Sequence, residues 1–108
     1  MDIIKLVEKL PNGKLGNIIS GQLIRAGTSV AANYRSACGA QSHLHFISKI
    51  HIVLEETDET LFWLEILIES GLMKNEFLKS LLKEADELSA IFASSIKNAK
   101  NSLIKSKI

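Results

Sequence analysis

Residues 47–68 read ISKIHIVLEETDETLFWLEILI, and the spacing of their apolar side chains decides the fold class. Apolar or small side chains recur in alternating steps of three and four, which places them along one face of an α-helix. Pro and Gly, the residues that most often end a helix, are absent from this stretch. We therefore expect a long helix whose inward stripe consists of Ile47, Ile50, Leu54, Thr57, Leu61, Leu64 and Ile68.

Pro and Gly elsewhere divide the chain into helical segments. The strongest breaks are Pro11-Asn12-Gly13, Gly39 and Gly71. Ser42 is a suitable N-cap for the segment that contains residues 47–68, and Gly71 suits the position just after its end. The predicted helices span about residues 2–10, 15–38, 42–71 and 75–104.

The second and fourth segments carry inward stripes of the same spacing. Long amphipathic helices joined by short loops pack as antiparallel neighbours, and 108 residues fit one compact core. The sequence therefore predicts a single domain, residues 1–108, with an all-α, antiparallel up-down four-helix bundle whose first helix is short. The two stripes are Ile19, Leu23, Ala26, Val30, Asn33 and Ala37, and Leu78, Leu81, Ala85, Leu88, Phe92, Ser95 and Ala99.

Composition narrows the class of protein. The formal net charge is +1, and the longest apolar runs are only a few residues, which excludes a transmembrane span. Residues 1–5 lack the basic and apolar pattern of a secretory signal. The single Cys cannot form an internal disulfide and suits a reducing compartment. We expect a cytoplasmic protein that does not bind membranes.

A second face of the third predicted helix carries more apolar surface than one bundle buries. This face lies two positions from the inward stripe, about 200° around the helix. A helix that is apolar over more than half of its circumference is covered by something beyond its own domain, and another copy is the natural cover. We expect a homo-oligomer whose interface includes Ile52, Glu56, Glu59, Trp63 and Ile66.

Glu56 and Glu59 have two interpretations. Paired carboxylates can divide the acid and base roles of an enzyme, but the sequence shows neither a nucleophile nor a substrate pocket beside them. The structural interpretation pairs them with Arg25 or Arg35, across helices or subunits. We favour the structural role and expect no enzyme; the alternative is a metal-dependent or small-ligand-binding bundle enzyme.

Metal-ligating patterns are weak. A di-metal site in a bundle needs Glu-x-x-His on two helices, and this pattern is absent. His51 and Glu55 lie one turn apart, but two ligands do not make a site. We expect no metal or cofactor.

Two further residues of the predicted helix 15–38 have structural interpretations. Asn33 lies within the inward stripe of this helix and can fix register and oligomeric state. Cys38 is expected to be a buried or half-buried packing residue.

Charge is uneven along the chain. Residues 1–41 carry +3, residues 42–72 carry −5, residues 73–96 carry −1 and residues 97–108 carry +4. The last segment either solvates a helix end or contacts phosphates. Any binding of RNA or DNA is expected to be weak and non-specific, because no phosphate-binding loop or zinc pattern accompanies the lysines. The candidate contacts are Lys97, Lys100, Lys105 and Lys107.

Two motifs resemble a known family. Residues 22–35 read QLIRAGTSVAANYR, and Phe46, Lys49 and residues 56–64, ETDETLFWL, follow them. Together they resemble the four-helix-bundle family of proteins encoded in intervening sequences of bacterial 23S rRNA genes, also labelled S23 ribosomal protein. The resemblance covers about residues 15–100.

This resemblance implies a small cytoplasmic bacterial protein that assembles into a homopentameric ring. The family is also similar to the accessory protein of diversity-generating retroelements, a basic pentamer that binds nucleic acid and a reverse transcriptase. The S23 label reflects a gene location and implies no role in the ribosome. The resemblance thus implies a non-enzymatic assembly or binding module whose partners are further copies of itself and RNA, DNA or a nucleic-acid enzyme.

Overall fold

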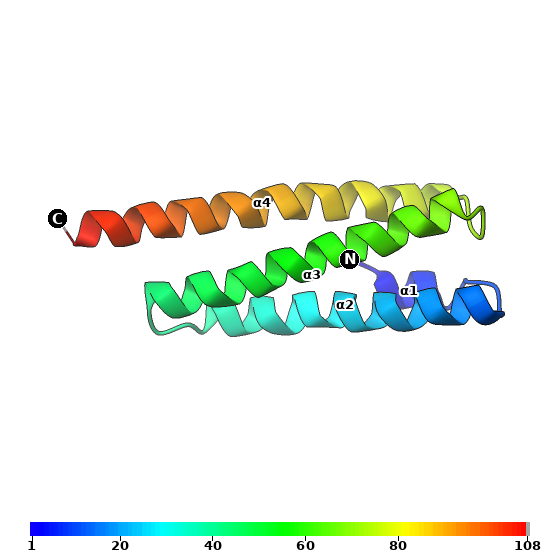
Figure 1. Ribbon diagram of the computed structural model, residues 1–108, viewed down its shortest axis with the longest axis horizontal. Helices are drawn as coiled ribbons and strands as arrows, with labels where there is room; N and C mark the ends of the chain where they lie inside the picture. Colours follow the sequence, from blue (N-terminus) through cyan, green and yellow to red (C-terminus); the bar gives the residue numbers. More distant parts are fainter. Residues whose placement is uncertain (108) are drawn as a thin grey trace.

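The structure is a computed structural model that describes residues 1–107. These residues form four α-helices and no strand: α1 (Ile3–Val7), α2 (Lys14–Cys38), α3 (His43–Glu69) and α4 (Glu76–Ser106) (Figure 1). The four predicted helices are confirmed, and the ends of the three long ones lie within two residues of the predicted ends. α1 is shorter than predicted, because Lys9 and Leu10 donate to carbonyls only three residues back and form a tight turn before Pro11.

Local signals at the helix ends explain these bounds. The Ser42 hydroxyl accepts a hydrogen bond of 3.1 Å from the His45 backbone N–H and begins α3. The Asn75 side chain does the same for Leu78 at 2.8 Å and begins α4. Gly71, just after the end of α3, has φ +72°, a conformation that costs glycine little, so the predicted stop at this residue is confirmed.

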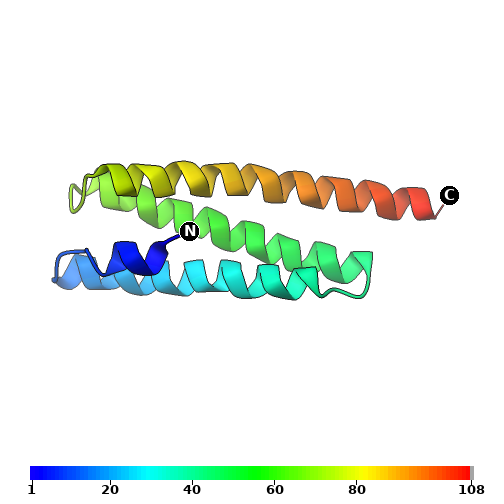
Figure 2. The same cartoon turned by 180° about the vertical axis from the view of Figure 1, so that it is seen from behind.

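The three long helices lie side by side in a rod of 56 × 19 × 17 Å, with α3 between α2 and α4. α3 packs against both neighbours, whereas the backbones of α2 and α4 stay apart over residues 1–107. α1 contacts α2 and α4 and so fills one end of the space between them (Figure 2). In both views the chain reverses direction from α2 to α3 and again from α3 to α4.

The middle position of α3 corrects the predicted inward stripe. Val53, Thr60 and Leu67 are completely buried, although they are not part of the predicted inward stripe. Because α3 is covered on two sides, its buried face is centred between α2 and α4 rather than on one neighbour. The residues expected to be inward but only half-buried are Asn33 in α2, Leu54, Leu61 and Ile68 in α3, and Leu88, Ser95 and Ala99 in α4, where Ile96 is buried instead.

The core has two parts that follow the rod. The larger cluster, which includes Leu6 of α1 and Leu64 of α3, lies at the end that α1 covers. The smaller cluster lies at the other end and consists of buried Val30, Ala37, Ile50, Val53, Phe92 and Ile96. Only three helices contribute to it, since α1 does not reach that far. No helix within residues 1–107 is long and apolar enough to cross a membrane.

Candidate functional site

The guanidinium of Arg25 on α2 bridges two carboxylates of α3. Its Nη1 lies 3.1 Å from Glu56 Oε2, and its Nη2 pairs with Glu59 Oε1. The hydrogen bond to Glu59 raises the pKa of Arg25 the most, and the negative charges of Glu56 and Glu59 raise it further. The Glu56 side chain is 18% exposed and that of Glu59 38%, so Glu56 is the more enclosed partner. Both carboxylates are thus engaged within one chain.

Three apolar residues share this face of α3 with the carboxylates. Ile52, Trp63 and Ile66 are each half-buried, so α2 already covers part of the face that the sequence left open. Phe62 is 50% exposed, and its ring meets the edge of Trp63 at a centroid distance of 5.0 Å. The Trp63 indole N–H is buried and has no acceptor within residues 1–107. Sequence patterns do not reveal such an unpaired donor.

The remaining polar candidates of α2 lie apart from this cluster. Asn33 is half-buried, and its side-chain N–H donates to the Ser29 backbone carbonyl at 2.9 Å. Arg35 is exposed and makes no ion pair with any residue that the structure describes. Cys38 is exposed, which corrects the expectation of a packing residue: the end of α2 presents it to solvent. Hydrogen bonding and charge from Cys38 raise the pKa of Tyr34, one turn away.

The histidine and carboxylate side chains do not gather into a metal site. Within residues 1–107, no three His, Cys, Asp or Glu residues lie close enough together to hold a metal ion. His51 and Glu55 are both exposed.

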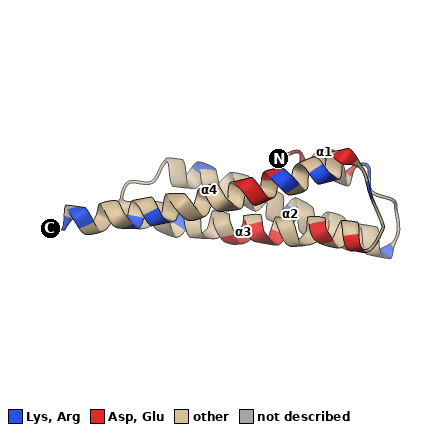
Figure 3. Ribbon diagram, turned by 90° about the horizontal axis from the view of Figure 1, so that it is seen from above, with Lys and Arg blue, Asp and Glu red and all other residues tan. Residues whose placement is uncertain are grey.

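One end of the rod contains no acidic residue. We call it the acid-free end and define it as residues 31–54 and 88–107. Tyr34 and Phe92 bring the two segments together, with ring centroids 5.9 Å apart, and the smaller core cluster joins them. All twelve Asp and Glu residues lie in the rest of the chain. In Figure 3 the red residues are confined to the part of the rod away from the C-terminus, whereas blue residues occur at both ends. The acid-free end holds Arg35, Lys49, Lys97, Lys100, Lys105 and Lys107 and the three histidines.

The acid-free end is therefore formally +6 with neutral histidines, whereas the rest of the chain is −5. Lys97, Lys100, Lys105 and Lys107 are all exposed. The sequence identified these lysines but missed the contribution of Arg35 and Lys49, because segments more than thirty positions apart become neighbours only when the helices fold back. The absence of Asp and Glu from both segments is the sequence signal that could have revealed the contribution of Arg35 and Lys49.

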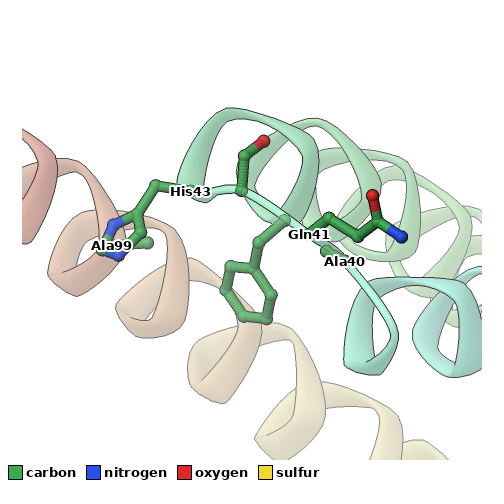
Figure 4. Close-up of a pocket in the computed structure, with 6 residues that line it drawn as sticks. Ala40, Gln41, His43 and Ala99 are labelled. Carbon is green, nitrogen blue, oxygen red and sulfur yellow. The ribbon is translucent and has the colours of Figure 1, made fainter.

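The same end carries a shallow pocket, which we call the end pocket. It has a volume of about 360 Å³ and lies where the turn between α2 and α3 faces α4. In Figure 4 the labelled Gln41 and His43 side chains lie on either side of it, with Ala99 of α4 near His43. The lining residues are Ala40, Gln41, Ser42, His43, Phe46 and Ala99.

Comparison with known proteins agrees with this architecture. Residues 1–94 match the family model described as 23S rRNA-intervening sequence protein. The chain is also similar to a crystal structure of a protein of unknown function from the S23 ribosomal protein family of Bacteroides thetaiotaomicron, with 38% sequence identity, a TM-score of 0.80 and 88% of each chain covered. No match was found among curated proteins.

Proposed function

This chain belongs to the 23S rRNA-intervening sequence protein family, and from that premise we propose that it is a non-enzymatic cytoplasmic binding module that assembles with itself and contacts nucleic acid through its acid-free end. The observation that carries the proposal is the complete separation of acidic residues from that end. A polyanion approaching it meets lysines and an arginine from three helices and no opposing carboxylate.

Self-assembly is supported by apolar side chains that remain exposed on the outside of α2 and α3. Ile18 and Ile24 of α2 and Phe62 of α3 are each about half exposed, and the half-buried Trp63 and Ile66 lie beside Phe62 along α3. Further copies of the chain would remove this surface from water. We propose a ring, with five copies as the resemblance to the family implies.

Light scattering across a dilution series tests the assembly. We expect a defined oligomer at micromolar concentration, and Phe62→Glu should weaken it because a charge would enter the apolar contact. Glu65→Gln, at an exposed position one turn along the same helix, serves as the control that leaves assembly intact. A stable helical monomer at all concentrations would overturn the oligomeric part of the proposal.

Fluorescence anisotropy with short single-stranded and duplex RNA at increasing salt tests the nucleic-acid contact. The logarithm of affinity should fall with the logarithm of salt concentration, by about 0.9 per phosphate neutralised on a B-form duplex and about 0.7 on a single strand. Replacing Lys97, Lys100, Lys105 and Lys107 together with Gln should flatten this slope.

The matched control replaces Lys5, Lys74, Lys79 and Lys83, which are exposed lysines outside the acid-free end. It makes the same change in net charge, so a slope that responds only to the first set locates binding at the acid-free end. Equal effects of the two sets, or binding that ignores salt, would contradict the proposal.

A further inference from the structure

We propose that the end pocket receives one unpaired base of a single-stranded nucleic acid, while the lysines beside it contact the neighbouring phosphates. This inference rests on the proposed function. It adds a substrate class, because it predicts that the protein prefers a single strand to a duplex. It also names the pocket residues that would distinguish a single strand from a duplex.

The pocket combines an aromatic wall with a small volume. Phe46 of α3 lines it and is half-buried, packed against the smaller core cluster, so its position is fixed by its neighbours. Aromatic side chains are the usual platforms for unpaired bases, since every base presents a flat π-face. At about 360 Å³ the pocket is near the lower limit of ligand sites, which suits one planar ring rather than a larger molecule.

Polar groups stand at the rim of the same pocket. Gln41 offers an amide that can both donate to and accept from a base edge, and His43 offers a ring nitrogen. These groups are few and exposed, so they would favour a base over an apolar ligand without selecting one base strongly.

Positive charge flanks the pocket on α4. Ala99 lines it, and the exposed Lys100, one position later, lies about 100° around the same helix, whereas Lys97, two positions earlier, lies about 200° around it, on the opposite face. A strand whose base enters the pocket therefore carries its phosphates along a surface that has lysines and no carboxylate. The bases of a duplex are stacked and paired and cannot enter, so a duplex would use the lysines alone.

The test compares two probes with the same number of phosphates, a short oligouridine and an abasic oligonucleotide of equal length, in anisotropy titrations at low salt. We expect the intact strand to bind about tenfold more tightly, because stacking of one base on an aromatic side chain has about this effect. Phe46→Leu should abolish most of that difference, whereas Phe77→Leu, at an equally half-buried Phe of α4 outside the acid-free end, should preserve it.

A second variant guards against a loss of folding in Phe46→Leu. Ala99→Leu fills the pocket from α4 without adding an aromatic ring and keeps every core side chain, so it too should weaken binding of the intact strand and leave binding of the abasic strand unchanged. Equal affinity of the two probes for the unmodified protein would overturn the base pocket and leave the proposed function standing. Failure of both probes to bind would overturn the proposed function itself.

Discussion

At the scale of single residues, Glu55 and Glu56 are adjacent in the sequence but differ in environment. Glu56 is partly enclosed and paired with Arg25, whereas Glu55 is exposed. We expect Glu56→Ala to lower the melting temperature by a few degrees, because the guanidinium loses its more enclosed partner. Glu56→Gln should lower it less, since an amide oxygen still accepts a hydrogen bond, and Glu55→Ala should leave it unchanged. Circular dichroism melts of the three variants decide whether the pair stabilises the fold.

Tyr34, the only tyrosine, offers a residue-level test of the end of α2. Cys38 raises the pKa of Tyr34 above the ordinary value of 10.0, through a hydrogen bond first and through thiolate charge second. The stability that follows from this raised pKa is present below pH 10.0 and is lost as pH rises through the folded-state value. In Cys38→Ala we expect the phenol to ionise at lower pH than in the parent, as measured by ultraviolet absorbance of the phenolate. An unchanged titration would show that the thiol does not act on it.

At the scale of helices, local signals predicted where elements begin and end, and packing decided which faces are buried. Ser42 and Gly71 act within one turn of their own positions, so the sequence is enough to place the ends of α3. The buried face of α3 depends on having neighbours on two sides, which no local pattern contains. The same distinction applies to the candidate site. The four lysines lie close together in the sequence and could be predicted from it, whereas the end pocket combines residues of the turn between α2 and α3, of α3 and of α4, which only the fold brings together.

Gly27 shows how tightly the shortest helix is held. A Cβ at this position would lie 3.1 Å from Cγ1 of Ile3, so even alanine would require Ile3 to shift by a few tenths of an ångström, and a branched side chain would press against α1. We expect Gly27→Val to cost about 1–3 kcal/mol, as overpacking does. Gly21→Ala is the matched control, because its Cβ would meet nothing within 4 Å, and it should stabilise α2 by about 0.5–1 kcal/mol. Urea unfolding followed by the fluorescence of Trp63, the sole tryptophan, measures both.

At the scale of the whole molecule, the separation of charge ties assembly to binding. In a ring whose copies all point the same way, the acid-free ends would crowd together on one rim and the acidic halves on the other. Added salt would screen the repulsion between like ends and strengthen assembly, while it would weaken the hold on RNA. We therefore expect salt to shift the two equilibria in opposite directions, as light scattering and anisotropy on the same samples would show. Dissociation of the oligomer by salt would contradict this arrangement.

Unequal ends also shape how quickly a partner is found. A charged strand diffusing toward a rod that is +6 at one end and −5 elsewhere is drawn to the positive end and turned away from the negative one before any atoms touch. Long-range attraction of this kind acts on the encounter rate, whereas the lifetime of the complex depends on contacts made after arrival. Collisions would therefore be frequent and would bring the nucleic acid to the positive end, so that even a short-lived complex would re-form rapidly after it dissociates.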